Sequence, residues 1–342
     1  MSEEEFLRRA AEVDAELRRQ NKLGTPSEKE VFAYADAERE AVEKHIAEAF
    51  GPIERVYYDG DNGGFRIDVA VSAPVEEERE YYTLTTIGMG SRRMDVPAEL
   101  AEKNRAYAEL AICLPPDWDL MNDTWPFRLL QETARRPFAE RRCLETGAAY
   151  RDGTLNEAGF TGVLILPAPT REETSHHLMV PGGKIVNFYL LLPVDREEWS
   201  YMLERKSSYP LWRRYMESGQ SLVVQPGRES CVDPETWFEE DIGPFTWTDG
   251  EEKNELCLEV VSWRSEIWES AGMQPDGLAW EKLAQAYLVK YRPEAQDAIS
   301  FDSSESVFCA ESGSGKELRA FALAFHDFCC SDEAMANLLK EM

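Results

Sequence analysis

The sequence predicts an α+β protein of two domains, each a mixed or antiparallel sheet packed with helices. Segments that alternate apolar and polar residues, typical of strands, are intermixed with segments of helical periodicity. The chain has 342 residues, 43% hydrophobic and 11% aromatic, which is enough for two packed cores and excludes wholesale disorder. Residues 229–252 are rich in proline, glycine and acids and predict a linker, so we place the domains at 1–235 and 236–342.

The first domain is expected to open with two helices. Apolar residues fall loosely on one face of residues 3–20, among many charges. A second helix is expected within residues 25–50, where Thr25 or Ser27 can cap it and acidic residues fill its first turns. A Gly-Pro pair follows and ends this helix.

Strands and helices then alternate along the rest of the first domain. The hexapeptide DGDNGG predicts a hairpin turn between the first two strands, and proline closes several of the later strands. Strands are expected within 54–59, 65–74, 82–87, 106–116, 160–169 and 185–194, and helices within 122–138, 195–206 and 209–219. The apolar residues expected in the core include Leu84, Leu114, Leu130, Leu164, Ile165, Leu190 and Leu191.

The second domain shows the same mixture on a smaller scale. A strand is expected at 254–263 and a hairpin at 299–312. Between them Trp280, Leu283, Ala284, Tyr287 and Leu288 follow the spacing of an amphipathic helix. The last expected helix places Leu318, Phe321, Ala322, Phe325 and Phe328 on one face.

The charge of the chain limits its partners. The net charge is −28, from 65 acidic and 37 basic residues, so the phosphates of nucleic acid would be repelled. A basic protein would be attracted, although an acidic surface also serves solubility alone. The N-terminus is charged where a signal peptide needs an apolar core, and no apolar run is long enough to span a bilayer. We therefore expect a cytoplasmic monomer with no membrane contact, whose seven scattered cysteines are free thiols rather than disulfides.

Two glycine-rich stretches imitate phosphate-binding loops. Gly88 and Gly90 precede Arg92 and Arg93, but a dinucleotide loop needs a third glycine and a following helix, which this stretch lacks. The stretch predicts a tight turn whose arginines pair with acids. The sequence GSGKEL at 313–318 lacks the other residues of a P-loop and predicts a loop that caps a helix.

No catalytic, cofactor or metal residue is assigned. His326 and Cys330 lie one helical turn apart, but a structural zinc site needs four ligands, and packed cysteines are the simpler interpretation. His176 and His177 are expected in an exposed loop. Carboxylates are abundant, yet none is singled out by its spacing, so we predict that the protein is not an enzyme.

The acidic stretch is the predicted partner-binding surface. Aromatic residues ringed by charge suit a protein interface, although they can equally pin the stretch to a domain. The residues of this prediction are Trp237, Glu239, Glu240, Asp241, Trp247, Glu251 and Glu252.

A series of blocks in the first domain resembles the bacterial form of the suppressor-of-fused-like domain. The blocks are YYTLTTIGMGSRRMDVP, AELAICLPPDW, WPFRLLQETARRPF, FTGVLILPAP and VNFYLLLPVDREEWSYML, in that order over about residues 35–233. The family carries a turn of the type T-x-G-M-S, then M-x-V-P, E-L-x-x-x-L-P and W-P-x-x-x-L. The matching positions here are Thr86, Gly88, Met89, Met94, Val96, Pro97, Glu109, Leu110, Leu114, Pro115, Trp125, Pro126 and Leu130, with Gly90 in place of the usual serine.

The C-terminal part is similar to immunity protein family fifty-one of polymorphic toxin systems. The family pattern G-Y-D-W-x-x-L keeps its Gly277, Trp280 and Leu283 here and loses its Tyr-Asp pair. A second pattern, F-D-x-E-x-x-x-F-C-A-x-S, is nearly kept over 301–312.

Both resemblances imply the same function. Bacterial members of both families are regarded as immunity proteins, so the chain resembles a polyimmunity protein that binds a secreted toxin in the cytoplasm and blocks it sterically. Such a protein needs no cofactor and no catalytic residue, and a basic toxin domain would suit its charge. The first resemblance also implies binding of an extended peptide. The alternative is a regulatory scaffold that sequesters an endogenous protein through the suppressor-of-fused-like domain.

Overall fold

The computed structural model describes residues 32–60, 64–75, 77, 79–171 and 174–342. The chain divides into two compact units, Met1–Cys231 and Val232–Met342. Both are sheets packed with helices, so the predicted α+β class is confirmed. The helix expected at 3–20 lies outside the described residues.

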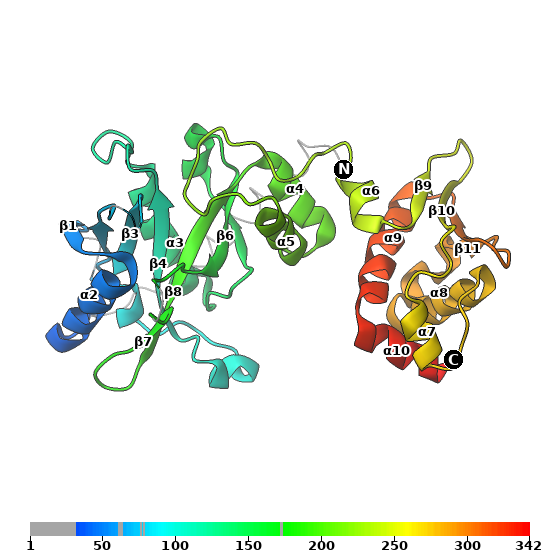
Figure 1. The fold of residues 1–342 in the computed structure, drawn as a ribbon. Coiled ribbons are helices and arrows are strands. Elements are labelled where there is room, and N and C mark those ends of the chain that lie inside the picture. The colour runs from blue at the N-terminus through cyan, green and yellow to red at the C-terminus, as the bar shows by residue number, and fades with distance from the viewer. Residues whose placement is uncertain (1–31, 61–63, 76, 78, 172–173) are drawn as a thin grey trace. The chain divides into compact units, whose positions relative to one another are not determined.

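The first unit is built on one mixed sheet (Figure 1). Every strand pair in it is antiparallel except the central pair of β4 and β8, which is parallel. Strand β7 (His177–Met179) pairs with the first half of β8. In sheet order the other strands are β1 (Ile53–Tyr57), β2 (Asp68–Ser72), β3 (Tyr82–Ile87), β4 (Tyr107–Leu114), β8 (Ile185–Val194), β6 (Gly162–Pro167) and β5 (Ala149–Arg151).

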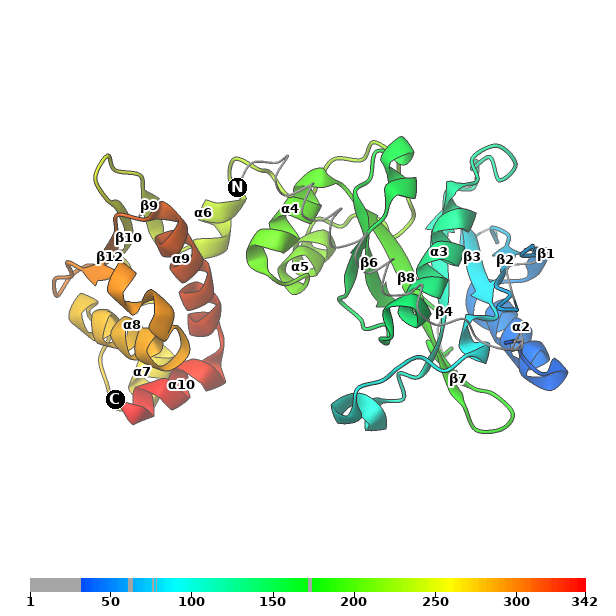
Figure 2. The same cartoon turned by 180° about the vertical axis from the view of Figure 1, so that it is seen from behind.

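Helices cover both faces of this sheet. Helix α2 (Asp36–Phe50) packs against Ala70 and Phe188 on one face, and α3 (Trp125–Glu140) packs against the residues that alternate with them on the other. Figures 1 and 2, seen from opposite sides, show the two helices on opposite faces. The seven apolar residues predicted for the core are all buried. The remaining elements are η2 (Met89–Ser91), η3 (Ala98–Lys103), η4 (Gly153–Ala158), α4 (Arg196–Arg205) and α5 (Tyr209–Glu217).

Helix α2 begins later than the sequence predicts. Phe32 forms a β-bridge with Phe65, and its amide donates to the carbonyl of Gly64 at 2.7 Å. The segment that was expected to continue the helix therefore runs extended beside the sheet, and the described helix starts at Asp36.

The second unit is a four-stranded antiparallel sheet with helices packed on one face. Trp280, Phe308 and Phe325 form the centre of its core with Leu256 and Leu258. The elements are α6 (Trp237–Ile242), β9 (Thr246–Thr248), β10 (Asn254–Leu258), α7 (Ser265–Ser270), α8 (Gly277–Tyr291), η5 (Pro293–Ala298), β11 (Ser300–Phe301), β12 (Phe308–Ser312), α9 (Gly315–Cys330) and α10 (Asp332–Glu341).

The predicted linker at 229–252 is wrong as a description of this segment. It contains α6 and β9, and Phe245 between them is 4% exposed. The ring of Phe245 lies 5.9 Å from that of Phe325 and 6.0 Å from that of Phe308. The acidic composition therefore belongs to a segment whose aromatic residues fill the core of the second unit.

The cysteine prediction is also corrected at two positions. Cys257 on β10 and Cys309 on β12 are directly opposite each other and form a disulfide. This pair could not be predicted from spacing, because the two cysteines are 52 positions apart in the sequence. The elements α7, α8, η5 and β11 lie between their two strands. Among the described residues no helix is long and apolar enough to cross a membrane.

Candidate functional site

The glycine pair of the first unit binds a carboxylate of the protein itself. The side chain of Glu109, on β4, is fully buried and accepts hydrogen bonds from the amides of Gly88 at 3.0 Å and Gly90 at 3.1 Å. It also accepts from the hydroxyls of Tyr34 at 2.7 Å and Thr86 at 2.5 Å. This turn is therefore a nest for an internal carboxylate, and the prediction that it is not a phosphate loop agrees with that geometry.

Burial sets the protonation of this group. Removal from water raises the pKa of the Glu109 carboxyl, while the four donors act in the opposite direction. The pKa of Tyr34 is raised well above its ordinary value by its burial and by the neighbouring Glu109. Gly90 leaves the space that the Tyr34 hydroxyl occupies, because a Cβ there would clash with it. The serine that is usual at this position in the family that the sequence resembles would therefore not fit beside Tyr34 in this chain.

Gly88→Ala should destabilise the first unit by about 2–3 kcal/mol. Gly88 has φ +126°, and a Cβ at this position would clash with the carbonyl oxygen of Arg66. Gly183→Ala is the matched control, since Gly183 also has a positive φ, +85°, but open space around it, and should cost about 1 kcal/mol. Urea unfolding of both variants measures the difference, and equal losses would show that backbone conformation alone explains the glycine.

Within the described part of the chain, neither arginine of the same stretch forms an ion pair with an acid. The guanidinium of Arg92 lies over the rings of Phe32 at 4.5 Å and Phe138 at 4.9 Å. Arg93 donates to the carbonyl of Met94 at 3.5 Å. The expected ion pairs are thus replaced by cation–π contacts at Arg92, which hold the extended segment at Phe32 against α3.

The aromatic residues of the predicted partner surface lie inside the second unit. Trp237 is 6% exposed, and the guanidinium of Arg319 stacks over it at 4.9 Å and over Phe238 at 3.7 Å. Trp247 is half-buried and packs edge-on against Phe238 at 5.3 Å. Both tryptophans therefore contact the ring of Phe238. This contact pins the segment to its own unit, which is one of the two roles that the sequence left open.

The acids of that surface separate into two groups. Asp241 is 5% exposed, whereas Glu239 and Glu240 lie on the outside of α6. Glu251 and Glu252 are exposed in the turn between β9 and β10. The second unit as a whole has three times as many acidic as basic residues, and it carries more than half of the net charge of −28. The charge that could attract a basic partner is therefore concentrated in this unit.

A cavity in the first unit is a second candidate site, which the sequence did not predict. It has a volume of about 760 Å³ and lies at the edge of the sheet, between the strands β5 and β6 and the helix α5. Tyr150, Leu164, Leu166, Tyr209 and Trp212 line it, and Tyr209 is 70% exposed. An apolar, aromatic hollow beside an edge strand suits the binding of a peptide or protein segment.

Two polar side chains that line this cavity have defined environments. Burial raises the pKa of the Cys143 thiol, and the neighbouring Glu145 acts in the same direction, so the neutral thiol is favoured. The carboxylate of Glu145 pairs with Arg105 at 3.0 Å.

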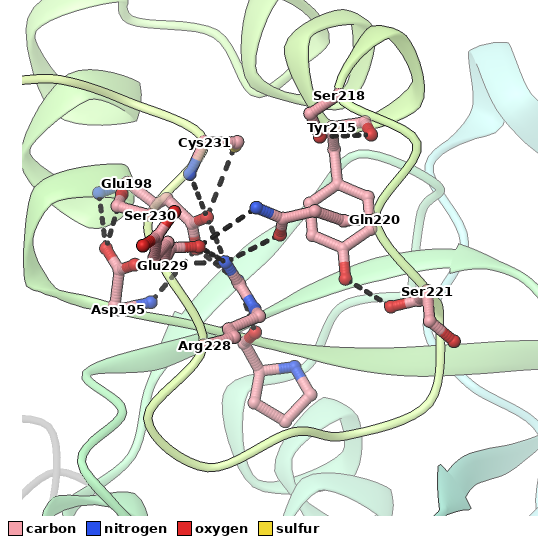
Figure 3. Close-up of polar contacts among 11 residues, drawn as sticks. Asp195, Glu198, Tyr215, Ser218, Gln220, Ser221, Arg228, Glu229, Ser230 and Cys231 are labelled. Carbon is pink, nitrogen blue, oxygen red and sulfur yellow. Dashed lines mark hydrogen bonds and ion pairs between the residues drawn. The ribbon is translucent and has the colours of Figure 1, made fainter.

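A buried polar cluster lies beside the helices α4 and α5 (Figure 3). Glu198, on α4, is fully buried, and each of its oxygens accepts a hydrogen bond from Arg228 at 2.6 Å. Its oxygens also accept from the amides of Asp195 at 3.1 Å and Cys231 at 3.3 Å. Gln220 accepts a further bond from Arg228 at 2.9 Å. The cluster fixes residues 220–231 onto α4, which packs against the cavity-lining α5.

Among the described residues, His326 and Cys330 do not belong to a group of three potential metal ligands. The Nε2 atom of His326 lies 3.4 Å from the sulfur of Cys330, and its ring stacks on Trp263 at 5.7 Å. Burial opposes the charged form, but hydrogen bonds to Asp327 and Cys330 outweigh it and raise the pKa of His326 to about 9. His176 and His177 are exposed, as expected, but His177 begins the strand β7 and does not lie in a loop. Among the described residues, Glu255, Cys257 and Cys309 bring three potential metal-ligand atoms together, although the two cysteines form a disulfide here.

Each of the two units contains a match to the model of a protein family. Residues 63–229 match the Suppressor of fused protein (SUFU) family, and residues 245–342 match Immunity protein 51. Both families consist of non-catalytic binding proteins, which is consistent with a protein-binding role for this chain. The two resemblances that the sequence indicated are thereby confirmed.

Solved structures show distant likenesses. The crystal structure of a Sufu–Fu complex shares 15% identity at a TM-score of 0.43, over 60% of this chain and 96% of that chain. Drosophila Suppressor of Fused shares 15% identity at a TM-score of 0.39, and the match spans 60% of this chain and about half, 52%, of that one. Comparison with curated proteins gives no match.

Proposed function

We propose that the protein is an immunity protein that binds and neutralises a secreted toxin in the cytoplasm. The match of residues 245–342 to Immunity protein 51 carries this proposal. The acidic charge of the same unit supports a basic toxin domain as the partner, since complementary charge speeds association and favours the correct partner. Inhibition by steric cover needs neither a cofactor nor a catalytic residue.

We assign the first contact to the exposed acids Glu239, Glu240, Glu251 and Glu252. They lie on two segments of one unit, α6 and the β9–β10 turn. The buried Trp237 and Asp241 would act by holding α6 in place, with Trp247 beside them. The cavity of the first unit would take an apolar segment of the same partner or of a second toxin.

The test starts from the secreted proteins of the cell that encodes this chain. The purified full chain is used as bait, and each recovered protein is expressed in a tester cell with and without the chain. A recovered protein that stops growth, and stops it only in the absence of the chain, supports the proposal. A recovered regulator without toxicity would replace it with the scaffold alternative.

Neutralising the four exposed acids should slow toxin association about tenfold at low salt and flatten its salt dependence. The change is Glu to Gln at 239, 240, 251 and 252, measured by stopped-flow mixing of the full chain with the identified toxin. The matched control makes the same change in charge on the first unit, at the exposed residues Glu40, Glu54, Glu80 and Asp117. Equal slowing by both sets would show that net charge alone matters and that these four acids have no special place.

A further inference from the structure

The face of the second sheet that points away from the core carries two cysteines and two glutamates on the neighbouring strands β10 and β12. Cys257 and Glu255 are two positions apart on β10, and Cys309 and Glu311 are two positions apart on β12. The register pairs Cys257 with Cys309 and Glu255 with Glu311. Because side chains alternate along a strand, all four point away from the core face that Leu256 and Ala310 share.

The donor atoms of three of these residues converge. The sulfurs of Cys257 and Cys309 and a carboxylate oxygen of Glu255 all lie within 4.8 Å of one another. The carboxylate of Glu311 is bonded to the ammonium group of Lys253, which also lies 3.9 Å from the carboxylate of Glu255. The Glu255 side chain is 37% exposed, so an ion can reach the cluster from solvent.

We propose that Glu255, Cys257 and Cys309 form a zinc site when the disulfide is reduced. Two thiolates and a carboxylate are ligands that zinc accepts. With three protein ligands this would be an open site rather than a closed structural one, and a water molecule would take the fourth tetrahedral position. The disulfide and the bound ion are then alternative links between the same two strands, one for oxidising and one for reducing conditions. This inference concerns the second unit alone and does not depend on the proposed toxin.

The conversion of the disulfide into the zinc-bound dithiolate conserves atoms and electrons. A dithiol reductant gives two electrons and two protons to the Cys257–Cys309 bond and itself becomes a disulfide, which leaves two thiols on the protein. Each thiol releases its proton to solvent as its sulfur binds the ion, since the thiolate is the ligand form.

The experiment titrates the full chain with zinc after reduction by dithiothreitol and its removal without air. A chromophoric chelator reports zinc affinity, and cobalt in place of zinc reports thiolate ligation through its near-ultraviolet charge-transfer band. We expect one ion per chain in the reduced protein. After reoxidation of the disulfide, zinc affinity should fall at least about 100-fold, because two ligands are lost.

Single substitutions locate the site. Cys257→Ser and Cys309→Ser should each lower zinc affinity at least about 100-fold, and Glu255→Gln about tenfold or more. Cys330→Ser is the matched control, because Cys330 is an exposed thiol 3.4 Å from His326 and should leave affinity unchanged. Cys309 is 8% exposed, so if Cys309→Ser fails to fold, the partly exposed Cys257 and Glu255 still decide the question.

Two outcomes would overturn the proposal. One is a reduced wild-type chain that binds zinc no more tightly than Cys257→Ser does. The other is a loss of binding in Cys330→Ser, which would move the site to His326.

Discussion

Arg228→Met is expected to lower the free energy of unfolding of the first unit by about 3–5 kcal/mol. The variant leaves the carboxylate of Glu198 buried without its bidentate partner, in a site where both of its oxygens face Arg228. A charge that has lost its partner cannot regain water there, so the cost exceeds that of a surface ion pair. Urea unfolding followed by far-ultraviolet circular dichroism measures it.

The control is Arg142→Met. Arg142 pairs with Glu140, but its side chain is 48% exposed, so the loss should stay within about 1 kcal/mol. The double variant Glu198→Gln/Arg228→Met removes both charges and should recover part of the stability, because no charge is left buried and unpaired. If Arg228→Met costs no more than Arg142→Met, the cluster does not hold residues 220–231 in place.

The second large effect concerns Glu109. Glu109→Leu should cost about 3–6 kcal/mol, because four buried donors lose their acceptor and each unsatisfied donor costs about 1–3 kcal/mol before water partly compensates. Differential scanning calorimetry of the full chain should show this loss in the transition of the first unit. A loss of less than about 1 kcal/mol would show that the network does not stabilise the sheet.

The Glu109→Gln variant tests the pH dependence of the same group. Burial raises the pKa of Glu109 above its ordinary value of 4.5 in the folded state, so the fold favours the protonated form. The stability that the raised pKa of Glu109 contributes is fully present below pH 4.5. The free energy of unfolding then declines as the pH rises through the folded-state pKa, by up to about 1.4 kcal/mol per pH unit. Gln is neutral throughout, so the wild type should lose stability relative to the variant over this range. A gain instead would mean that the four donors hold the carboxylate ionised.

Local patterns predicted most elements of the fold. The spacing of Trp280, Leu283 and Leu288 gave α8, and the alternation of apolar residues gave the central strands. Helix α10 was missed although its cap is a local signal, since the hydroxyl of Ser331 accepts from the amide of Ala334 at 3.4 Å. Its buried residues Met335, Leu338 and Leu339 also follow helical spacing, so both signals were present in the sequence.

Contacts between distant residues could not be predicted in the same way. Glu198 and Arg228 are 30 positions apart in the sequence, and the hydrogen bond from Tyr34 to Glu109 joins residues 75 positions apart. Abundant acids and arginines allow many pairings, and only the folded backbone selects among them. The cavity was missed for the same reason, because its lining comes from strands and a helix that are separate in the sequence. The acidic composition of 229–252 was read correctly as charge but wrongly as a linker, since Phe245 within it is a core residue.

The parallel pair at the centre of the first sheet has a consequence for how the chain is made. Strands β1 to β4 are neighbours in sequence and can pair as soon as they leave the ribosome, but β4 must wait for β8, which begins at Ile185. Until then the inner edge of β4 exposes unpaired backbone along an apolar strand. During the synthesis of residues 115–184 this edge of β4 is therefore open to wrong pairing with other nascent chains.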